Sequence, residues 1–136
     1  MSASEHPLEE FVRVAEFRAA LRRFARGSER AARNWGLTPQ RYQLLLMIKG
    51  APAGDQRSTV TELAERLQLA QSTVTELVGR AEEAGLLQRE PSADDGRVAH
   101  LRLTAEGERL LNEAFAELEA DRQRLVEAFL ALAQRL

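Results

Sequence analysis

Hydrophobic residues return every three or four positions over the first part of the chain. No proline interrupts the stretch between Leu8 and about Arg33. The apolar residues with helical spacing there are Val14, Phe17, Leu21 and Phe24. We therefore predict a long amphipathic helix. A monomer would bury its apolar seam in its own core, whereas a dimer could share it.

Turn and capping residues predict a second, shorter helix. The segment from Asn34 to Leu37 indicates a break, after which Thr38 and Pro39 supply an N-cap and a proline at the first helical position. Gly50 closes the segment after about a dozen residues. A polar loop rich in glycine and proline follows from Ala51 to Arg57.

The middle of the chain repeats one apolar pattern twice. Thr59 and Glu62 fit a capping box that opens a short helix from Val60 to Leu67. The same i, i+3, i+4, i+7 spacing occurs in two sets, first Val60, Leu63, Ala64 and Leu67, then Val74, Leu77, Val78 and Ala81. The second helix ends at Ala84-Gly85, with the glycine at the expected C′ position. Two amphipathic helices joined by so short a turn are typical of a helix-turn-helix.

The pattern then changes to alternation and back to helical spacing. Leu86 to Glu90 and Val98 to Leu103 alternate with period two, which predicts the two strands of a β-hairpin. Thr104 is positioned to cap the next helix. Two apolar stripes follow, Leu110, Leu111, Ala114, Phe115 and Leu118, then Leu125, Val126, Phe129, Leu132 and Leu136. Their register shifts near Glu119 to Arg124, which predicts a kink or a break. The expected fold is mainly α with a small β-hairpin wing (α+β).

Composition narrows the function classes. A chain of 136 residues with 44% hydrophobic and 29% charged residues is that of a globular domain, and no apolar run is long enough for a bilayer or a signal peptide. A cytoplasmic protein is expected. The absence of cysteine excludes disulfides, thiolate zinc sites and thiol redox sensing. His6 and His100 form no recognisable motif, so neither a metal, nor a cofactor, nor enzymatic activity is expected.

The charge balance argues mildly against a nucleic-acid partner. The formal net charge is −2, whereas basic domains are the usual nucleic-acid binders. The charge is uneven, since residues 1–34 hold seven arginines against five acids and residues 105–136 hold four against seven. Of the 19 basic residues only Lys49 is a lysine, and arginine is the better residue for bidentate phosphate contact. A genome-wide composition bias would give the same preference.

The second helix of the helix-turn-helix has two unlike faces. At about 100° per residue, its apolar residues share one arc, and the opposite arc holds Gln71, Ser72, Thr75, Glu76 and Gly79. Short polar side chains near a helix N-terminus allow the helix to enter a major groove and to read base edges. An ordinary surface helix that carries Ser and Thr is the simpler alternative.

These residues resemble a known family. The stretch from Ser58 to Gly107 is similar to the DNA-binding core of the MarR family of bacterial regulators, and the flanking helices match the order of elements in that family. The most specific match is the wing signature Asp95-x-Arg97-x-x-x-Leu101-x-Leu103-Thr104-x-x-Gly107. The resemblance implies an obligate homodimer with intertwined first and last helices, each recognition helix in a major groove and each wing arginine in a minor groove.

The resemblance also implies roles for single residues. Arg97 would read the minor groove and Asp95 would orient it, although a solvated turn pair is the alternative. Arg80 would contact phosphate, and the groove-facing set would be Gln71, Ser72, Thr73 and Thr75. The implied organisation is an N-terminal dimerisation helix (1–34), a winged helix-turn-helix domain (38–104, with the helix-turn-helix at 60–84 and the wing at 86–104) and C-terminal dimerisation helices (105–136).

Three residues depart from the family pattern. Ala70 stands where an N-cap serine is common, so the recognition helix would start less firmly or use Ser72 instead. Gly96 replaces a second basic residue of the wing tip, and Glu76 places an acid on the groove face. These departures predict modest affinity or an unusual sequence preference.

Family members commonly bind small aromatic anions between the dimer helices and the winged domain. Trp35 and Tyr42 are the expected lining of such a crevice, with Phe17 and Phe115 as apolar walls and Arg41 or Arg18 as counter-charge. Plain core packing is the alternative for each aromatic residue.

The leading hypothesis is therefore a homodimeric transcriptional regulator, most often a repressor, that binds a pseudo-palindromic operator in double-stranded DNA. A small aromatic or anionic effector would release it. The alternative is a winged helix that binds protein partners with little or no DNA binding, consistent with the acidic net charge.

Overall fold

The computed structural model describes residues 4–91 and 98–134, and within them it contains six helices and a two-stranded antiparallel sheet. The helices are α1 (Leu8–Asn34), α2 (Pro39–Lys49), α3 (Val60–Leu67), α4 (Gln71–Glu83), α5 (Ala105–Glu117) and α6 (Glu119–Ala133). The strands are β1 (Leu87–Pro91) and β2 (Ala99–Leu103). The predicted mainly helical fold with a β-hairpin is confirmed.

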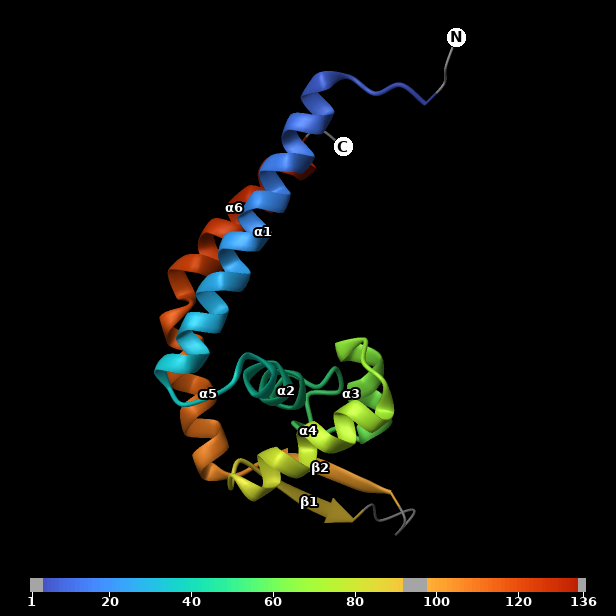
Figure 1. Cartoon of the computed structure of the whole chain (residues 1–136), viewed down its shortest axis with the longest axis vertical. Helices are drawn as coiled ribbons and strands as arrows, with labels where there is room; N and C mark the ends of the chain where they lie inside the picture. Colours follow the sequence, from blue (N-terminus) through green and yellow to red (C-terminus); the bar gives the residue numbers. More distant parts are fainter. Residues whose placement is uncertain (1–3, 92–97, 135–136) are drawn as a thin grey trace.

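The molecule has an elongated arm and a compact end. The arm consists of α1 and α6, which lie side by side, and α5 connects α6 to the compact end (Figure 1). There α2, α3, α4 and the hairpin pack together. The chain therefore separates a long helical pair from a small winged helix-turn-helix.

Local capping residues fix the starts of α2 and α3. The Thr38 side chain accepts a hydrogen bond from the Arg41 backbone N–H, and Thr59 and Glu62 form a complete capping box at the start of α3. Helix α3 ends at Gln68, which takes the left-handed conformation at φ 57°. The turn to α4 is consequently as short as the sequence predicts.

Helix α2 is the centre of the core. Leu44, Leu45 and Ile48 are completely buried, and they pack with residues of every neighbouring element of the compact end. The other large side chains that are almost completely buried are Leu63, Val74, Val78, Leu101 and Leu118. Each such side chain stabilises the fold by roughly 2 kcal/mol through removal of apolar surface from water.

The hairpin is shifted slightly from its expected bounds. Leu87 pairs with Leu103 and Pro91 with Ala99, so the first strand starts one residue later than the alternation suggests. Leu86 is buried instead at the turn after α4, where its backbone N–H donates to Ala81 O and its carbonyl accepts from Thr104 N. Ser58 adds a single bridge to Leu101 on the free side of β2.

The break between α5 and α6 falls at Leu118, one residue before the stretch in which the register shifts. Leu118 is 1% exposed, with φ −90° and ψ 2°. Its burial in the core turns the chain there. The Phe115 carbonyl accepts from the backbone of Leu118 at 3.2 Å and from Arg122 Nη1 at 2.7 Å, so an arginine side chain satisfies the carbonyl at the break.

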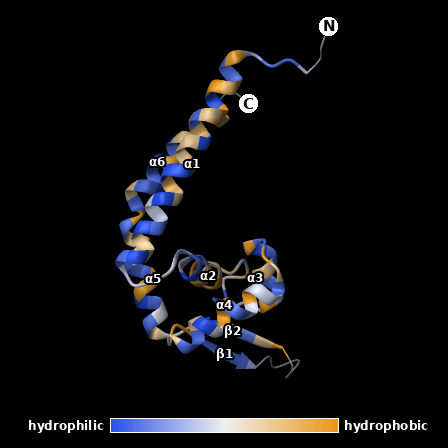
Figure 2. Cartoon of the chain, viewed as in Figure 1, coloured by the Kyte–Doolittle hydropathy of each residue, from blue (hydrophilic) through white to orange (hydrophobic). Residues whose placement is uncertain are grey.

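Hydrophobic side chains remain exposed on the arm. Leu8, Phe11 and Val12 of α1 and Phe129 and Leu130 of α6 are each more than half exposed, and α6 has no buried residue. Figure 2 shows hydrophobic positions along this part of the arm. Over the described residues, no helix has both the length and the apolar character that a membrane crossing requires.

Candidate nucleic-acid interface

Helix α4 presents a polar face outward. Val74, Leu77, Val78 and Ala81 are buried against the core. Gln71, Ser72 and Thr75 are exposed, and Thr73 is half-buried at the edge of this face. The helix therefore exposes the side chains that the sequence predicts for the groove and buries the opposite arc.

The start of α4 lacks a side-chain cap. Ala70 occupies the N-cap position, and among the described residues no side chain, including that of Ser72, accepts from the first-turn amides. These amides have no partner inside the helix and lie at the positive end of its dipole, so they suit a phosphate oxygen. Gln71 Nε2 donates to Thr61 Oγ1 at 3.3 Å and ties the start of α4 to α3.

An ion pair lies on the exposed face of α4. Arg80 Nη2 is 2.8 Å from Glu76 Oε1, and both side chains are more than 60% exposed. Exposed pairs of this kind contribute at most about 1 kcal/mol. A phosphate can therefore replace Glu76 as the partner of Arg80 at little cost.

The base of the wing is held by a compact hydrogen-bond group around Thr104. Its hydroxyl donates to Gly85 O at 2.6 Å and accepts from Gly107 N at 3.1 Å. A Cβ atom at Gly107 would collide with the Leu86 carbonyl oxygen, so only glycine fits this close approach. Thr104 and Gly107 of the wing signature thus join the hairpin to α5. Asp95, Gly96 and Arg97 lie outside the described residues.

A cavity of about 300 Å³ lies between the arm and the compact end. Tyr42 and Phe115 line it, together with Phe24, Leu125 and the guanidinium of Arg122. The Arg122 guanidinium lies 3.7 Å above the centre of the Phe115 ring. Burial raises the pKa of the Tyr42 hydroxyl, although nearby Arg122 acts in the opposite direction, so the phenol stays a hydrogen-bond donor at neutral pH.

Known proteins share this arrangement. A family model described as MarR family matches residues 35–98, which run from the end of α1 into the wing. The transcriptional regulator Tm0710 from Thermotoga maritima superimposes with a TM-score of 0.67 at 27% identity, over 88% of this chain and 80% of Tm0710. Residues 35–98 of the chain are a MarR-family segment.

Other similarities agree with this assignment. YsmB of Bacillus subtilis, named an uncharacterised HTH-type transcriptional regulator, is 32% identical over 71 residues, 52% of this chain and 49% of YsmB. The HTH-type transcriptional repressor IacR of Pseudomonas putida is 29% identical over 85 residues, 62% of this chain and 48% of IacR. The chain thus spans about half the length of these curated relatives. A variant of MarR from E. coli, solved in complex with operator DNA, shares the fold with a TM-score of 0.67 at 19% identity, over 81% of this chain and 76% of that protein.

Several residues expected to line an effector crevice do not line the cavity beside Arg122. Trp35 does not line the cavity, because its indole N–H donates to Glu117 Oε1 at 2.7 Å and turns the ring toward α5. Phe17 lies nearer the N-terminus, with its ring centre 6.0 Å from that of Phe129. Arg18 and Arg41 are also not among the residues that line the cavity.

Sequence reasoning missed Arg122 as the positive group beside Tyr42. The only signal was its position inside the stretch where the apolar register shifts. A single arginine in a charged helix otherwise carries no mark of such a position. The described residues contain no group of three or more His, Asp or Glu side chains arranged to hold a metal ion.

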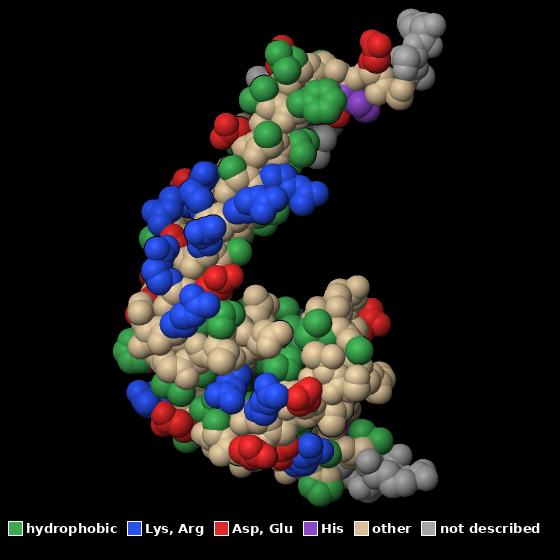
Figure 3. Space-filling view, viewed as in Figure 1, with side chains coloured by type: hydrophobic (Ala, Val, Ile, Leu, Met, Phe, Trp, Pro, Cys, Tyr) green, Lys and Arg blue, Asp and Glu red, His purple; other side chains and the backbone are tan. Residues whose placement is uncertain are grey.

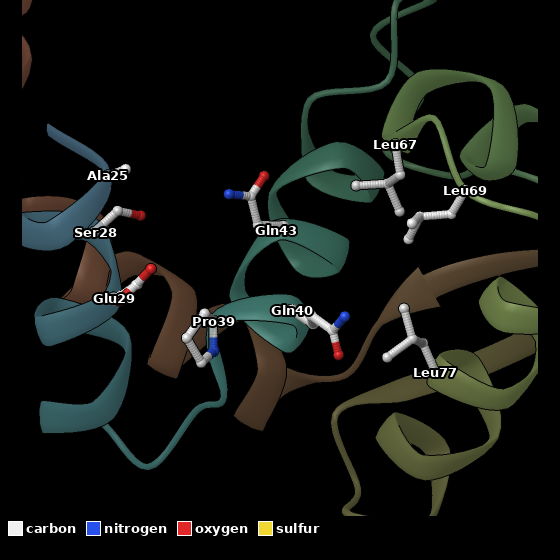
Figure 4. A pocket seen from close by; sticks show the side chains of 9 residues that line it. All are labelled: Ala25, Ser28, Glu29, Pro39, Gln40, Gln43, Leu67, Leu69 and Leu77. Atoms are coloured by element: carbon white, nitrogen blue, oxygen red, sulfur yellow. The ribbon is translucent and has the colours of Figure 1, made fainter. Parts of the chain in front are cut away.

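A second cavity of about 270 Å³ lies where α1 and α2 face the helix-turn-helix. Figure 4 shows Leu67, Leu69 and Leu77 on one side of it and the polar side chains of Ser28 and Glu29 on the other. Among the described residues that line this cavity, Glu29 is the one charged side chain. An anion is therefore favoured in the Arg122 cavity and disfavoured in this one.

Proposed function

We propose that the chain is a transcriptional repressor that binds double-stranded DNA as a homodimer and places α4 in the major groove. The observation that carries the proposal is the division of α4 into a buried apolar arc and an exposed face of Gln71, Ser72 and Thr75. Amide and hydroxyl side chains of this kind hydrogen-bond to base edges. Arg80 contacts the DNA backbone, and Arg97 of the wing, oriented by Asp95, stays the predicted minor-groove contact.

The homodimer is supported by the exposed apolar surface of the arm. Phe11 is 60% exposed and Phe129 is 53% exposed, on helices that a single chain leaves uncovered. Large exposed apolar patches are unfavourable in water and mark interaction surfaces. The proposed organisation assigns residues 1–34 and 105–136 to dimerisation and residues 38–104 to DNA binding.

The proposed effector is a small aromatic anion bound in the cavity beside Arg122. A cavity of about 300 Å³ is at the lower end of the range for small-molecule sites. Arg122 supplies the counter-charge, Tyr42 supplies a donor hydroxyl and Phe115 supplies an apolar wall. Because the cavity adjoins both the arm and α2, an occupant changes the angle between them and so the spacing of the two α4 helices in a dimer.

YsmB is named a transcriptional regulator and IacR a transcriptional repressor, and both names support the proposed role in transcription. The MarR variant in complex with operator DNA supports double-stranded DNA as the binding partner. Since the chain covers only about half of the curated relatives, the DNA target, the dimer and the effector are proposals.

The deciding experiment is selection of bound fragments from a pool of random duplexes, followed by fluorescence anisotropy on the selected site and on a scrambled one. Each lost base contact costs about 1–3 kcal/mol on the correct site. Gln71→Ala should therefore weaken binding to the selected site at least fivefold and leave the scrambled site unchanged. Gln123→Ala, an exposed glutamine on α6, is the matched control.

Absence of binding to any duplex at low salt contradicts the proposal, because phosphate contacts alone produce measurable affinity there. That result favours a winged helix that binds proteins, in which Glu76 rather than phosphate neutralises Arg80. Arg97→Ala should reduce the salt slope of log K by about one unit without unfolding the protein.

A further inference from the structure

Five arginines form a row along α1. Within a stretch of about 22 Å, at 1.5 Å per residue, they occupy roughly a third of the circumference of the helix. The arginine row consists of Arg18, Arg22, Arg26, Arg30 and Arg33, all of which are exposed. Figure 3 shows Lys and Arg side chains along the near face of the α1 arm. Glu29 is the one acid on the same arc of α1. This surface is therefore strongly positive, although the whole chain has a formal net charge of −2.

The arginine row differs from the other arginines of the protein. Six described arginines outside α1 are ion-paired, namely Arg57, Arg80, Arg89, Arg102, Arg109 and Arg124. In the part of the chain that the structure describes, no arginine of α1 is ion-paired or donates a side-chain hydrogen bond. Like charges at i, i+4 destabilise a helix, and the row contains three such steps. The unbalanced charge therefore makes this surface of α1 attractive to an external anion.

The row is separate from the apolar surface proposed for dimerisation. On α1 the exposed large hydrophobic side chains end at Leu21. From Arg22 to Asn34 every exposed residue is Arg, Ala, Glu or Asn. A second copy of the chain therefore finds apolar surface on the first half of α1 and little on the second half, where four of the five arginines of the row lie.

We propose that the arginine row binds the phosphate backbone of a second segment of double-stranded DNA, without reading its sequence. A linear basic stripe along one helix is the electrostatic footprint of a nucleic-acid contact. Guanidinium groups bind phosphate oxygens in bidentate fashion. The row lies on the arm, whereas α4 belongs to the compact end (Figure 1). One protein thus holds a sequence-specific site at α4 and a second stretch of duplex at α1, and joins the two.

This inference goes beyond the proposed function, because the row needs no contact with α4. The test uses Arg22→Gln combined with Arg26→Gln, since glutamine keeps the helix propensity and removes two charges. The matched control is Arg109→Gln combined with Arg124→Gln, which removes the same net charge from arginines already paired with Glu106 and Asp121.

The first assay holds the protein on an immobilised selected duplex and then adds a fluorescent duplex of unrelated sequence at low salt. Wild type and control should capture the second duplex, and the row variant should capture at least fivefold less while it still binds the immobilised one. The salt slope for the second duplex should fall by about two units in the row variant alone.

Four results overturn the inference. Wild type captures no second duplex, or the row variant captures as much as the control. Poly-L-glutamate binds through the row while duplex DNA does not, which indicates an acidic protein partner. The row variant changes the dimer dissociation constant in sedimentation and not DNA capture, which assigns the row to the contact between copies.

Failure of the proposed function gives a different pattern. In that case no sequence is selected and the immobilised duplex does not hold the protein by α4. The row is then tested in solution with an unrelated duplex, and the row variant should again lose affinity relative to the control.

Discussion

Replacement of Gly107 by alanine tests how the wing is joined to α5. The new Cβ would lie 3.2 Å from the Leu86 carbonyl carbon and closer to its oxygen, whereas carbon atoms in contact prefer about 3.5–4.0 Å. Both atoms belong to the backbone, so no side chain can rotate away. The start of α5 must move, which strains the hydrogen bond from Gly107 N to Thr104 Oγ1.

The size of the effect follows from three contributions. Overpacking of this kind costs about 1–3 kcal/mol. A weakened cap costs about 1 kcal/mol more, and the higher helix propensity of alanine offsets up to about 1 kcal/mol. We expect a net loss of about 2 kcal/mol, which lowers the unfolding temperature by roughly 6–10 °C for a chain of this length.

The assay is urea unfolding followed by far-UV circular dichroism at one fixed protein concentration, because a dimer's stability depends on concentration. Gly79→Ala is the control, since a Cβ there meets nothing within 4 Å and α4 should gain about 0.5–1 kcal/mol. The reasoning is refuted when Gly107→Ala unfolds at the same midpoint as wild type or above it.

Three further substitutions test the site. Glu76→Gln removes a negative charge from the groove face and should raise affinity for duplex DNA up to about fivefold at low salt, measured by anisotropy, with a smaller gain at high salt. Arg122→Gln should weaken binding of benzoate about tenfold in calorimetry, whereas Arg41→Gln, outside the cavity, should not; equal losses in both would contradict the assigned counter-charge. Glu117→Gln keeps the shape of the side chain but weakens the acceptor of the Trp35 indole N–H. It should lower the free energy of unfolding by about 1 kcal/mol and shift the fluorescence emission of the single tryptophan. Unchanged emission would show that this bond does not form in solution.

Local signals explain how much of the fold the sequence predicts. The capping box at Thr59 and Glu62, the cap at Thr104 and the glycine at position 85 act within one turn, and each appears in the structure where it was expected. The outward face of α4 follows from helix periodicity alone, so it too could be derived. Arg89 follows buried Leu87 by two residues in β1, so alternation alone assigns both to one face of the hairpin, yet Arg89 is exposed and bonds to Glu82.

Contacts between distant parts of the chain could not be read in this way. The bond between Trp35 and Glu117 joins residues 82 positions apart and removes Trp35 from the expected crevice. The position of Arg122 beside Tyr42 depends on the break at Leu118. Residue spacing does not predict how that break turns the side chains that follow it. The ion pair between Glu76 and Arg80 has i, i+4 spacing on one helix, so the sequence alone would have predicted it.

The unequal caps of α3 and α4 affect how the protein responds to a binding partner. The capping box fixes the first turn of α3, whereas the first turn of α4, after Ala70, has no side-chain acceptor. Backbone hydrogens of residues 71–73 should exchange with deuterated solvent faster than those of residues 60–62. A ligand oxygen that accepts hydrogen bonds from these amides slows their exchange. Recognition and ordering of the first turn of α4 therefore occur in one step. The free energy of binding is reduced by the cost of ordering that turn.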